Sequence, residues 1–380
     1  MDNLKSDDWQ SRTVDWLRYP LMLLILMCHS NSPLICELPQ TGVSVCCYYI
    51  SITVARLAVP MFFIFSGYYF FRKPDTFNRT VYLSKIRKRA LTLLVPYLFW
   101  NYFVWGFLLL RVVLKGLTEW LPSNTFTLPA ILDVVVGWDE SYGGMPKAFQ
   151  LWFIRDLMIV CLLSPLLYRL LKTKRPYILL LFTALYLMPW PDGWNLFFSR
   201  LPSALLFFSI GAYMGIHKQN MVEMSRRVPL WLGITVSTLL LAATTWEHMT
   251  SGHFVKLAEN LFSIAAVIPT MQIASTLVDR YRLKPVKFIA DSNFLLFVLH
   301  PLIIIYLISE PLLGQVTNTP LHFWAIYAAE IVVPALVCVV LYAILSRLLP
   351  RTTSLLTGGR GGKQGLAKKC IFARFFEPEL

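Results

Sequence analysis

Arg18 and His29 are ionisable residues inside the first long apolar stretch of the chain, Trp16–Ile35. Such groups are costly within a bilayer, which makes each of them a candidate functional residue. Eleven residues of helix make about three turns, so both side chains project from one face, ~16 Å apart along the axis. If Arg18 lies at one membrane surface, His29 lies about halfway across a hydrocarbon core ~30 Å thick. The spacing predicts a cation at the rim and, deep inside, an imidazole that can transfer protons near neutral pH.

Asp15 precedes Arg18 by three residues and can pair with it on the same helix face. Structural alternatives stay open for both chemical candidates. Arg18 could be an interfacial anchor whose head group reaches the membrane surface. His29 could be a hydrogen-bonded contact between helices. Neither alternative requires the two residues to share a face.

Three further candidates lie in the second apolar stretch, 46–71. Arg56 is expected to face the interior of the helix bundle. An ion pair with a carboxylate such as Asp156 is the structural alternative for it. Ser66 and Gly67 allow another helix or a ligand to approach closely. We therefore expect these residues to position a substrate.

The basic run Lys85–Arg89 follows this stretch. Clustered cations suit phosphate groups, so Arg87, Lys88 and Arg89 are candidate ligands for a phosphate-bearing co-substrate. An orientation signal in contact with anionic lipids is the alternative.

Later apolar stretches contribute Trp152, Arg155 and His300 as further candidates for positioning a substrate. A lone histidine such as His300 is more often a hydrogen-bonded contact between helices than a catalytic group. The Cys and His residues have no metal-ligand spacing, so we expect no metal site.

The composition assigns the chain to the membrane proteins. Of its 380 residues, 56% are hydrophobic and 15% are charged, whereas a soluble globular protein is about 25% charged. The sequence predicts an all-α, polytopic membrane bundle of about ten transmembrane helices of ~20 residues each. The expected spans are 16–36, 46–71, 90–110, 150–168, 176–190, 200–216, 229–246, 255–277, 289–310 and 321–346.

The net charge of +14 does not indicate a nucleic-acid partner, because the distribution of the basic residues explains it. Of the 35 Lys and Arg residues, 28 fall near the termini or in alternate loops. The positive-inside rule then places both termini in the cytoplasm. We expect one membrane domain over residues 1–350 and a flexible, basic cytoplasmic tail over residues 351–380.

Taken in order, these motifs resemble the acyltransferase 3 family of integral membrane acyltransferases. The family opens with an Arg, ten residues and a His, which here are Arg18 and His29. The other matching segments are Pro60–Tyr68, Lys85–Tyr97, Leu151–Phe153, Phe207–Gly211 and Ser292–Pro301.

The chain departs from the family's pattern in the basic run. A second Arg often follows the first by three residues, but Thr92 stands at that position if Arg89 is the first. Lys88 or Arg87 would have to substitute in a clamp of two arginines.

The resemblance implies a multi-pass O-acyltransferase of the bacterial inner membrane. Its donor would be cytoplasmic acyl-CoA, above all acetyl-CoA, used as a co-substrate with no bound cofactor. Its acceptor would be a hydroxyl of a surface glycan or of a lipid-linked glycan precursor, and membrane lipids would surround it. By position, Arg18 and Arg89 would bind the CoA phosphates, and His29 would act as general base. An acyl-histidine intermediate is the competing route.

Two other classes of function stay open. Intramembrane Arg and His residues also line transport paths, so a membrane transporter of a small polar molecule is the main alternative. The sequence has no visible inverted repeat or matched pair of broken helices in its favour. The other class is a structural subunit of a glycan-assembly complex. In that case no single intramembrane polar substitution would abolish function in a folded protein.

Overall fold

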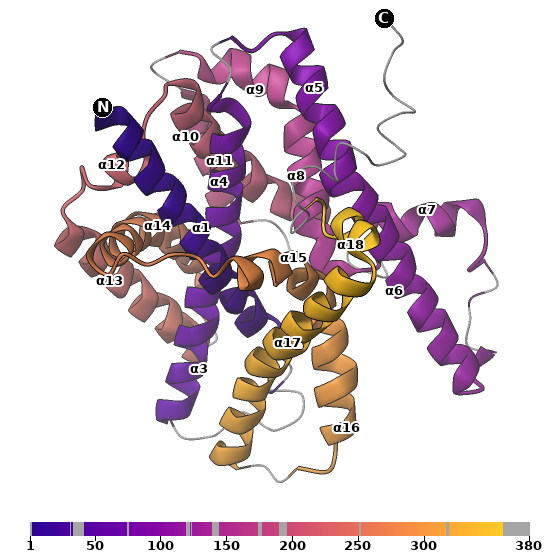
Figure 1. Cartoon of the computed structure of the whole chain (residues 1–380). Helices are drawn as coiled ribbons and strands as arrows, with labels where there is room; N and C mark the ends of the chain where they lie inside the picture. The colour runs from indigo at the N-terminus through magenta and orange to yellow at the C-terminus, as the bar shows by residue number, and fades with distance from the viewer. Residues whose placement is uncertain are drawn as a thin grey trace, which may run out of the picture.

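The structure is a computed structural model. It describes residues 2–30, 32, 42–73, 76–118, 122, 124–138, 144–173, 177–189, 196–250, 252–316 and 319–359. Every regular element among these residues is a helix, which confirms the predicted all-α class. Together the helices form a bundle (Figure 1).

The elements are α-helices interrupted by two π-helical segments, η1 and η5, and one 3₁₀ segment, η4. In chain order they are α1 (Asp2–Cys28), α3 (Gly42–Ala55), α4 (Ala58–Phe71), α5 (Arg79–Arg89), η1 (Ala90–Leu94), α6 (Val95–Leu114), α7 (Leu128–Val136), η4 (Phe149–Leu151), α8 (Trp152–Leu162), α9 (Ser164–Leu171), α10 (Tyr177–Leu187), α11 (Leu196–Ile216), α12 (Met221–Ser225), α13 (Leu230–Met249), α14 (Val255–Arg280), α15 (Lys287–Leu302), η5 (Ile303–Ser309), α16 (Glu310–Leu312), α17 (Pro320–Leu348) and α18 (Pro350–Leu356).

Six helices in the described part of the chain are long and apolar enough to cross a membrane. A seventh span results if the bent pair Phe149–Leu162 and Ser164–Leu171, which meet at 62°, counts as one. Tyr177–Leu187 and Arg200–Ile216 are apolar but shorter. The chain is therefore a multi-pass membrane protein, and the predicted count of about ten spans is not confirmed.

The first helix starts earlier than the apolar pattern predicts. It begins at residue 2 rather than near Trp16. The guanidinium of Arg226 lies 4.4 Å from the ring of Trp9, and the side-chain oxygen of Gln10 accepts a hydrogen bond from the backbone N–H of Met221. These contacts hold the polar first part of α1 against α12 and Arg226. A prediction from apolar length alone does not include this part of the helix.

The chain also continues as a packed helix beyond the predicted domain boundary at residue 350. α18 lies against α6, where the indole N–H of Trp100 donates to the carbonyl of Leu356 at 3.0 Å. Gly358 has a φ of +68°, and a Cβ there would lie 2.3 Å from the carbonyl oxygen of Thr92. The predicted flexible tail therefore begins with residues that pack on the membrane domain, while its remainder, 360–380, lies outside the described residues.

α4 and α11 approach each other across glycines. A Cβ on Gly67 would lie 2.0 Å from the carbonyl oxygen of Phe208, and one on Gly211 would lie 1.9 Å from that of Ile64. Backbone atoms cannot yield as a flexible side chain can, so only glycine permits this separation. Gly67 thus has a packing role between two helices that line the site described below.

We expect Gly67→Ala to lower the free energy of unfolding by about 1–3 kcal/mol, as overpacking of a well-packed core does. Thermal unfolding of the purified protein in detergent measures this effect. Gly106→Ala is the control, because a Cβ at Gly106 meets no atom within 4 Å. Equal unfolding temperatures for the two variants would contradict the close contact of α4 with α11.

The helix ends define two sides of the molecule. Figure 1 shows the start of α1 with α5 and α9 at one end, and the start of α3 with α16 and the start of α17 at the other. The first end carries the basic run Lys85–Arg89. We call it the cytoplasmic end and the opposite one the outer end, following the topology predicted from the loop charges.

Candidate functional site

The described residues enclose a cavity of about 1760 Å³ between the helices. Arg18, Arg89 and Lys287 line its cytoplasmic half, and Tyr48 and Lys256 line its outer half. Between them lie apolar side chains, among them Met22, Ile25, Phe62, Phe65, Phe153 and Phe297. One cavity therefore connects polar groups from the two halves of the bundle.

His29 lines this cavity directly after the end of α1. Its ring centre is 5.2 Å from that of His300 and 5.3 Å from that of Phe149, which approaches edge-on. His300 comes thirteen residues after the start of α15 at the cytoplasmic end. At ~1.5 Å per residue this is ~20 Å of helix, which places His29 well inside a hydrocarbon core ~30 Å thick.

Glu330 of α17 fixes the chain directly after His29. This fully buried carboxylate accepts hydrogen bonds from the hydroxyl of Ser30 and, at 3.1 Å, from the backbone N–H of Ser32. The hydroxyl of Ser309 in η5 donates to its other oxygen at 3.2 Å. Three segments of the chain therefore meet at one carboxylate. Glu330 is not among the predicted site residues, although a glutamate within an apolar helix is a signal that could have identified it.

His300 lies behind His29 and does not line the cavity. Its Nδ1 is 3.2 Å and 2.9 Å from the carbonyl oxygens of Leu296 and Phe297. Because carbonyls only accept hydrogen bonds, Nδ1 carries the hydrogen. Its Nε2 is buried and has no hydrogen-bond partner among the described residues. His300 is thus placed to support His29 rather than to meet a substrate.

Arg18 and Asp15 form the predicted pair at the cytoplasmic rim, with 2.6 Å between the guanidinium Nη1 and the carboxylate. Both side chains are about half exposed, at 46% and 47%, and both line the cavity. The side-chain amide of Asn293, in α15, donates to the carbonyl of Arg18 at 3.3 Å. α15 therefore helps to position this part of α1.

In the basic run, Arg89 lines the cavity, whereas Arg87 and Lys88 are exposed and do not. The guanidinium of Arg89 lies 5.9 Å from the ring centre of Phe70. Thr92 follows in the π-helical segment η1, and its hydroxyl donates to the carbonyl of Lys88 at 2.9 Å. Within the described residues, the run thus contributes one arginine to the cavity instead of a clamp of two.

Arg56 enters the cavity at the junction of α3 and α4 and pairs with Glu259, with 2.9 Å between Nε and the carboxylate. The structural alternative for Arg56 is an ion pair with a carboxylate such as Asp156. The ion pair is present, but its carboxylate is Glu259 of α14. The same carboxylate lies 3.1 Å from His248 Nε2 and 3.7 Å from Lys256 Nζ. This group sits near the outer ends of α13 and α14.

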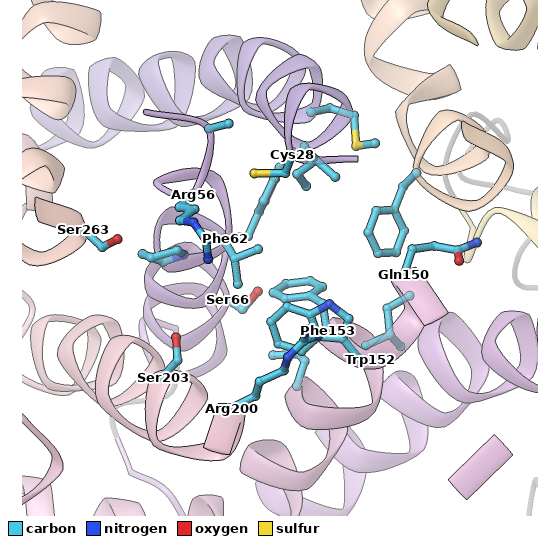
Figure 2. A pocket seen from close by; sticks show the side chains of 18 of the residues that line it. Cys28, Arg56, Phe62, Ser66, Gln150, Trp152, Phe153, Arg200, Ser203 and Ser263 are labelled. Carbon is cyan, nitrogen blue, oxygen red and sulfur yellow. The ribbon is translucent and has the colours of Figure 1, made fainter. Parts of the chain in front are cut away.

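Trp152 and Ser66, which the sequence suggests as positioning residues, also line the cavity (Figure 2). The guanidinium of Arg200 lies 4.5 Å from the ring centre of Trp152. Arg200 is not among the predicted site residues, because it stands at the first position of the expected span 200–216, where a cation is typical of a span end. α11 begins at Leu196, which makes Arg200 part of the helix.

Arg155 has an anchoring role outside the cavity. Its Nε donates to the buried carboxylate of Asp156 at 3.1 Å, and its Nη1 donates to the carbonyls of Val136 at 2.9 Å and Gly144 at 2.8 Å. It thereby ties the end of α7 to α8. Within the described part of the chain, no three His, Cys, Asp or Glu side chains are grouped as metal ligands.

Comparison with known proteins places this arrangement in a family. Residues 12–354 match the acyltransferase 3 family, described as an acyltransferase domain. The chain is 28% identical over 322 residues to the "Succinoglycan biosynthesis protein ExoH" of Rhizobium meliloti (strain 1021), covering 82% of this chain and 81% of that protein. No solved structure matches the chain. Since the match spans nearly the whole membrane domain, this chain belongs to the acyltransferase 3 family.

Proposed function

We propose that this protein is an inner-membrane O-acyltransferase that moves an acyl group, above all acetyl, from cytoplasmic acyl-CoA to a hydroxyl of a surface glycan or its lipid-linked precursor. The observation that carries the proposal is the continuous cavity with His29 on its wall between cations from both ends of the bundle. The family supports the acyltransferase class. The glycan acceptor rests on the relative whose name places it in succinoglycan biosynthesis.

Acyl-CoA would enter at the cytoplasmic rim. Arg18, Arg89 and Lys287 line the cavity there, and guanidinium groups bind phosphate oxygens through paired hydrogen bonds. The apolar side chains deeper in the cavity suit the uncharged pantetheine arm. This placement would bring the thioester toward His29, while the acceptor hydroxyl approaches from the outer end.

His29 would act as general base. The imidazole takes the proton of the acceptor hydroxyl, the hydroxyl oxygen bonds to the thioester carbon, and the carbon–sulfur bond breaks. The leaving thiolate of CoA then takes that proton from the imidazolium, so that the products are an ester and free CoA, and His29 is neutral again. The anchor on Glu330 would hold His29 in place, since it binds both Ser30 and Ser32. An acyl-histidine intermediate is the competing route.

The proposal is tested in cells and with purified protein. Surface glycans from cells with the wild-type protein, without it and with His29→Ala are compared by mass spectrometry for a base-labile acyl group. In parallel, the protein in lipid nanodiscs is supplied with acetyl-CoA and assayed for release of free CoA thiol. An acyl group present only with the wild type supports the proposal. If glycans from all three kinds of cell carry the same acyl groups and the purified protein releases no thiol, the transporter class is favoured instead.

Arg89→Gln is expected to raise the KM for acyl-CoA by about tenfold, because one charge-assisted contact to phosphate contributes ~1.5–3 kcal/mol. Lys88→Gln should raise it far less, because Lys88 is exposed and outside the cavity. Steady-state kinetics of thiol release measures both. Equal effects of the two substitutions would show that the basic run acts through its overall charge.

A further inference from the structure

The outer half of the cavity contains more cations than carboxylates. Arg56, Lys256 and Arg200 line it there, and Glu259 is the carboxylate that lines it with them. Glu259 is 3% exposed and lies next to both Arg56 and Lys256. Counting Lys, Arg, Asp and Glu, the described lining residues give this half two more positive than negative charges. Charges inside a membrane are stable when they pair.

Among the cations of this outer half, Arg200 has no carboxylate partner in the described part of the chain. Its described contacts are the sulfur of Met145, 3.3 Å from Nη1, and the ring face of Trp152. No described carboxylate lies within ion-pair distance of it. The carboxylate of Asp156 bonds to Arg155 through Oδ1, and its Oδ2 has no hydrogen-bond partner among the described residues.

Arg56 also pairs with a carboxylate through only part of its guanidinium group. Its Nε faces Glu259, and this is the ion pair found for it among the described residues. Its side chain is 43% exposed, and it borders the cavity. Figure 2 shows Arg56 and Arg200 entering the same cavity from different helices, with Ser66 between them in this view. The two side chains thus offer guanidinium hydrogen-bond donors to one space.

We propose that the outer half of the cavity binds an anionic group of a substrate, with Arg200 and Arg56 as its guanidinium ligands. Guanidinium forks fit carboxylate and phosphate oxygens, and a bound anion would supply the missing counter-charge. The inference rests on the proposed function only in assigning that anion to one of the two substrates. Arg200 and His29 line the same cavity, so the anion would lie in the space that also holds the reacting groups.

Two sources can supply such an anion. An acyl group derived from a dicarboxylic acid carries a free carboxylate at its far end. In the acceptor, an acidic sugar carries a carboxylate, and a sugar phosphate carries a phosphate group. The chemistry recognised is the same in both cases, and Arg200 would select for charged over neutral forms of that substrate.

The test is binding to the full-length protein in lipid nanodiscs, measured by isothermal titration. One arm compares sodium glucuronate with glucose, and the other compares succinyl-CoA with acetyl-CoA. We expect the wild type to prefer the charged member of at least one pair, and we expect Arg200→Gln to reduce that preference by at least about tenfold. Arg200→Lys, which keeps the charge, should retain part of it. Arg351→Gln, on the exposed surface of α18, should retain all of it.

The outcomes separate the possibilities. Loss of preference in the glucuronate arm assigns the anion to the acceptor, and loss in the succinyl-CoA arm assigns it to the acyl group. Equal binding of charged and neutral probes by the wild type would overturn the inference, as would a preference that survives in Arg200→Gln. If neither acyl-CoA binds, the proposed function fails, while the glucuronate arm still decides whether the anion site exists.

Discussion

Replacing His29 with alanine or glutamine is expected to lower the rate of acyl transfer by about 10²–10⁴-fold, the contribution of a positioned general base. The reason is geometric. His29 borders the cavity between the cytoplasmic and outer cations, and no other described histidine lies there except His253, near the outer end of α14. Thiol release from acetyl-CoA and acylation of glycans are the two measurements, with the amount of membrane-inserted protein determined in parallel.

His322→Gln is the matched control, because this histidine near the start of α17 does not line the cavity. It should leave both activities unchanged. Normal acylation by both His29 variants would exclude the catalytic role. A His29→Gln protein that binds acetyl-CoA as the wild type does, yet transfers nothing, would place the loss in the chemical step.

The same preparation distinguishes the two chemical routes. An acyl-histidine intermediate predicts that the peptide carrying His29 gains the mass of one acyl group when the acceptor is withheld. A general base predicts no such adduct, because the acceptor oxygen attacks the thioester directly. Rapid quenching and mass spectrometry of the wild type without acceptor decide between them.

The sequence was most informative where a polar residue interrupts an apolar stretch. Arg18, Arg56 and His29 stand out in this way, and the structure places all three on one cavity. Membrane energetics explains this success, since such residues persist in a span only when they face the bundle interior or water.

The sequence was least informative where helix crossing decides the neighbours. Arg200 stands at the edge of a short apolar stretch, and only the close approach of α4 to α11 brings it into the cavity with Ser66. The partner of Arg56 is a similar case. Asp156 and Glu259 are both acidic residues of apolar helices, and spacing along the chain does not show which one lies beside α3.

The sequence also did not show which of several adjacent basic residues faces the cavity. Arg87, Lys88 and Arg89 are adjacent cations, but successive residues of a helix point about 100° apart. Only Arg89 turns toward the cavity. Which of the three does so depends on how α5 packs, and that packing includes the ring of Phe70 beside Arg89.

Replacing Glu330 with alanine is expected to produce the largest loss of stability. Its carboxylate accepts from Ser30, Ser32 and Ser309 in a fully buried site, and each buried donor left without a partner costs about 1–3 kcal/mol. Glu330→Gln keeps one acceptor oxygen and should lose less. Thermal unfolding in detergent measures the series. Glu310→Ala is the control, because that exposed carboxylate pairs with Arg111 and Lys115 at the surface, where ion pairs contribute about 1 kcal/mol or less.

Glu330 should also affect the reaction through the position of His29. In Glu330→Gln protein that remains folded, we expect kcat to fall while the KM for acyl-CoA stays near the wild-type value, because the cytoplasmic rim is untouched. A purely structural role would instead lower the amount of active protein and leave the kcat of the folded fraction unchanged. Active-site titration with a labelled acyl-CoA separates these two results. Wild-type stability and wild-type kcat in Glu330→Ala would together rule out the anchor, because they would mean that the segment after His29 holds its place without that carboxylate.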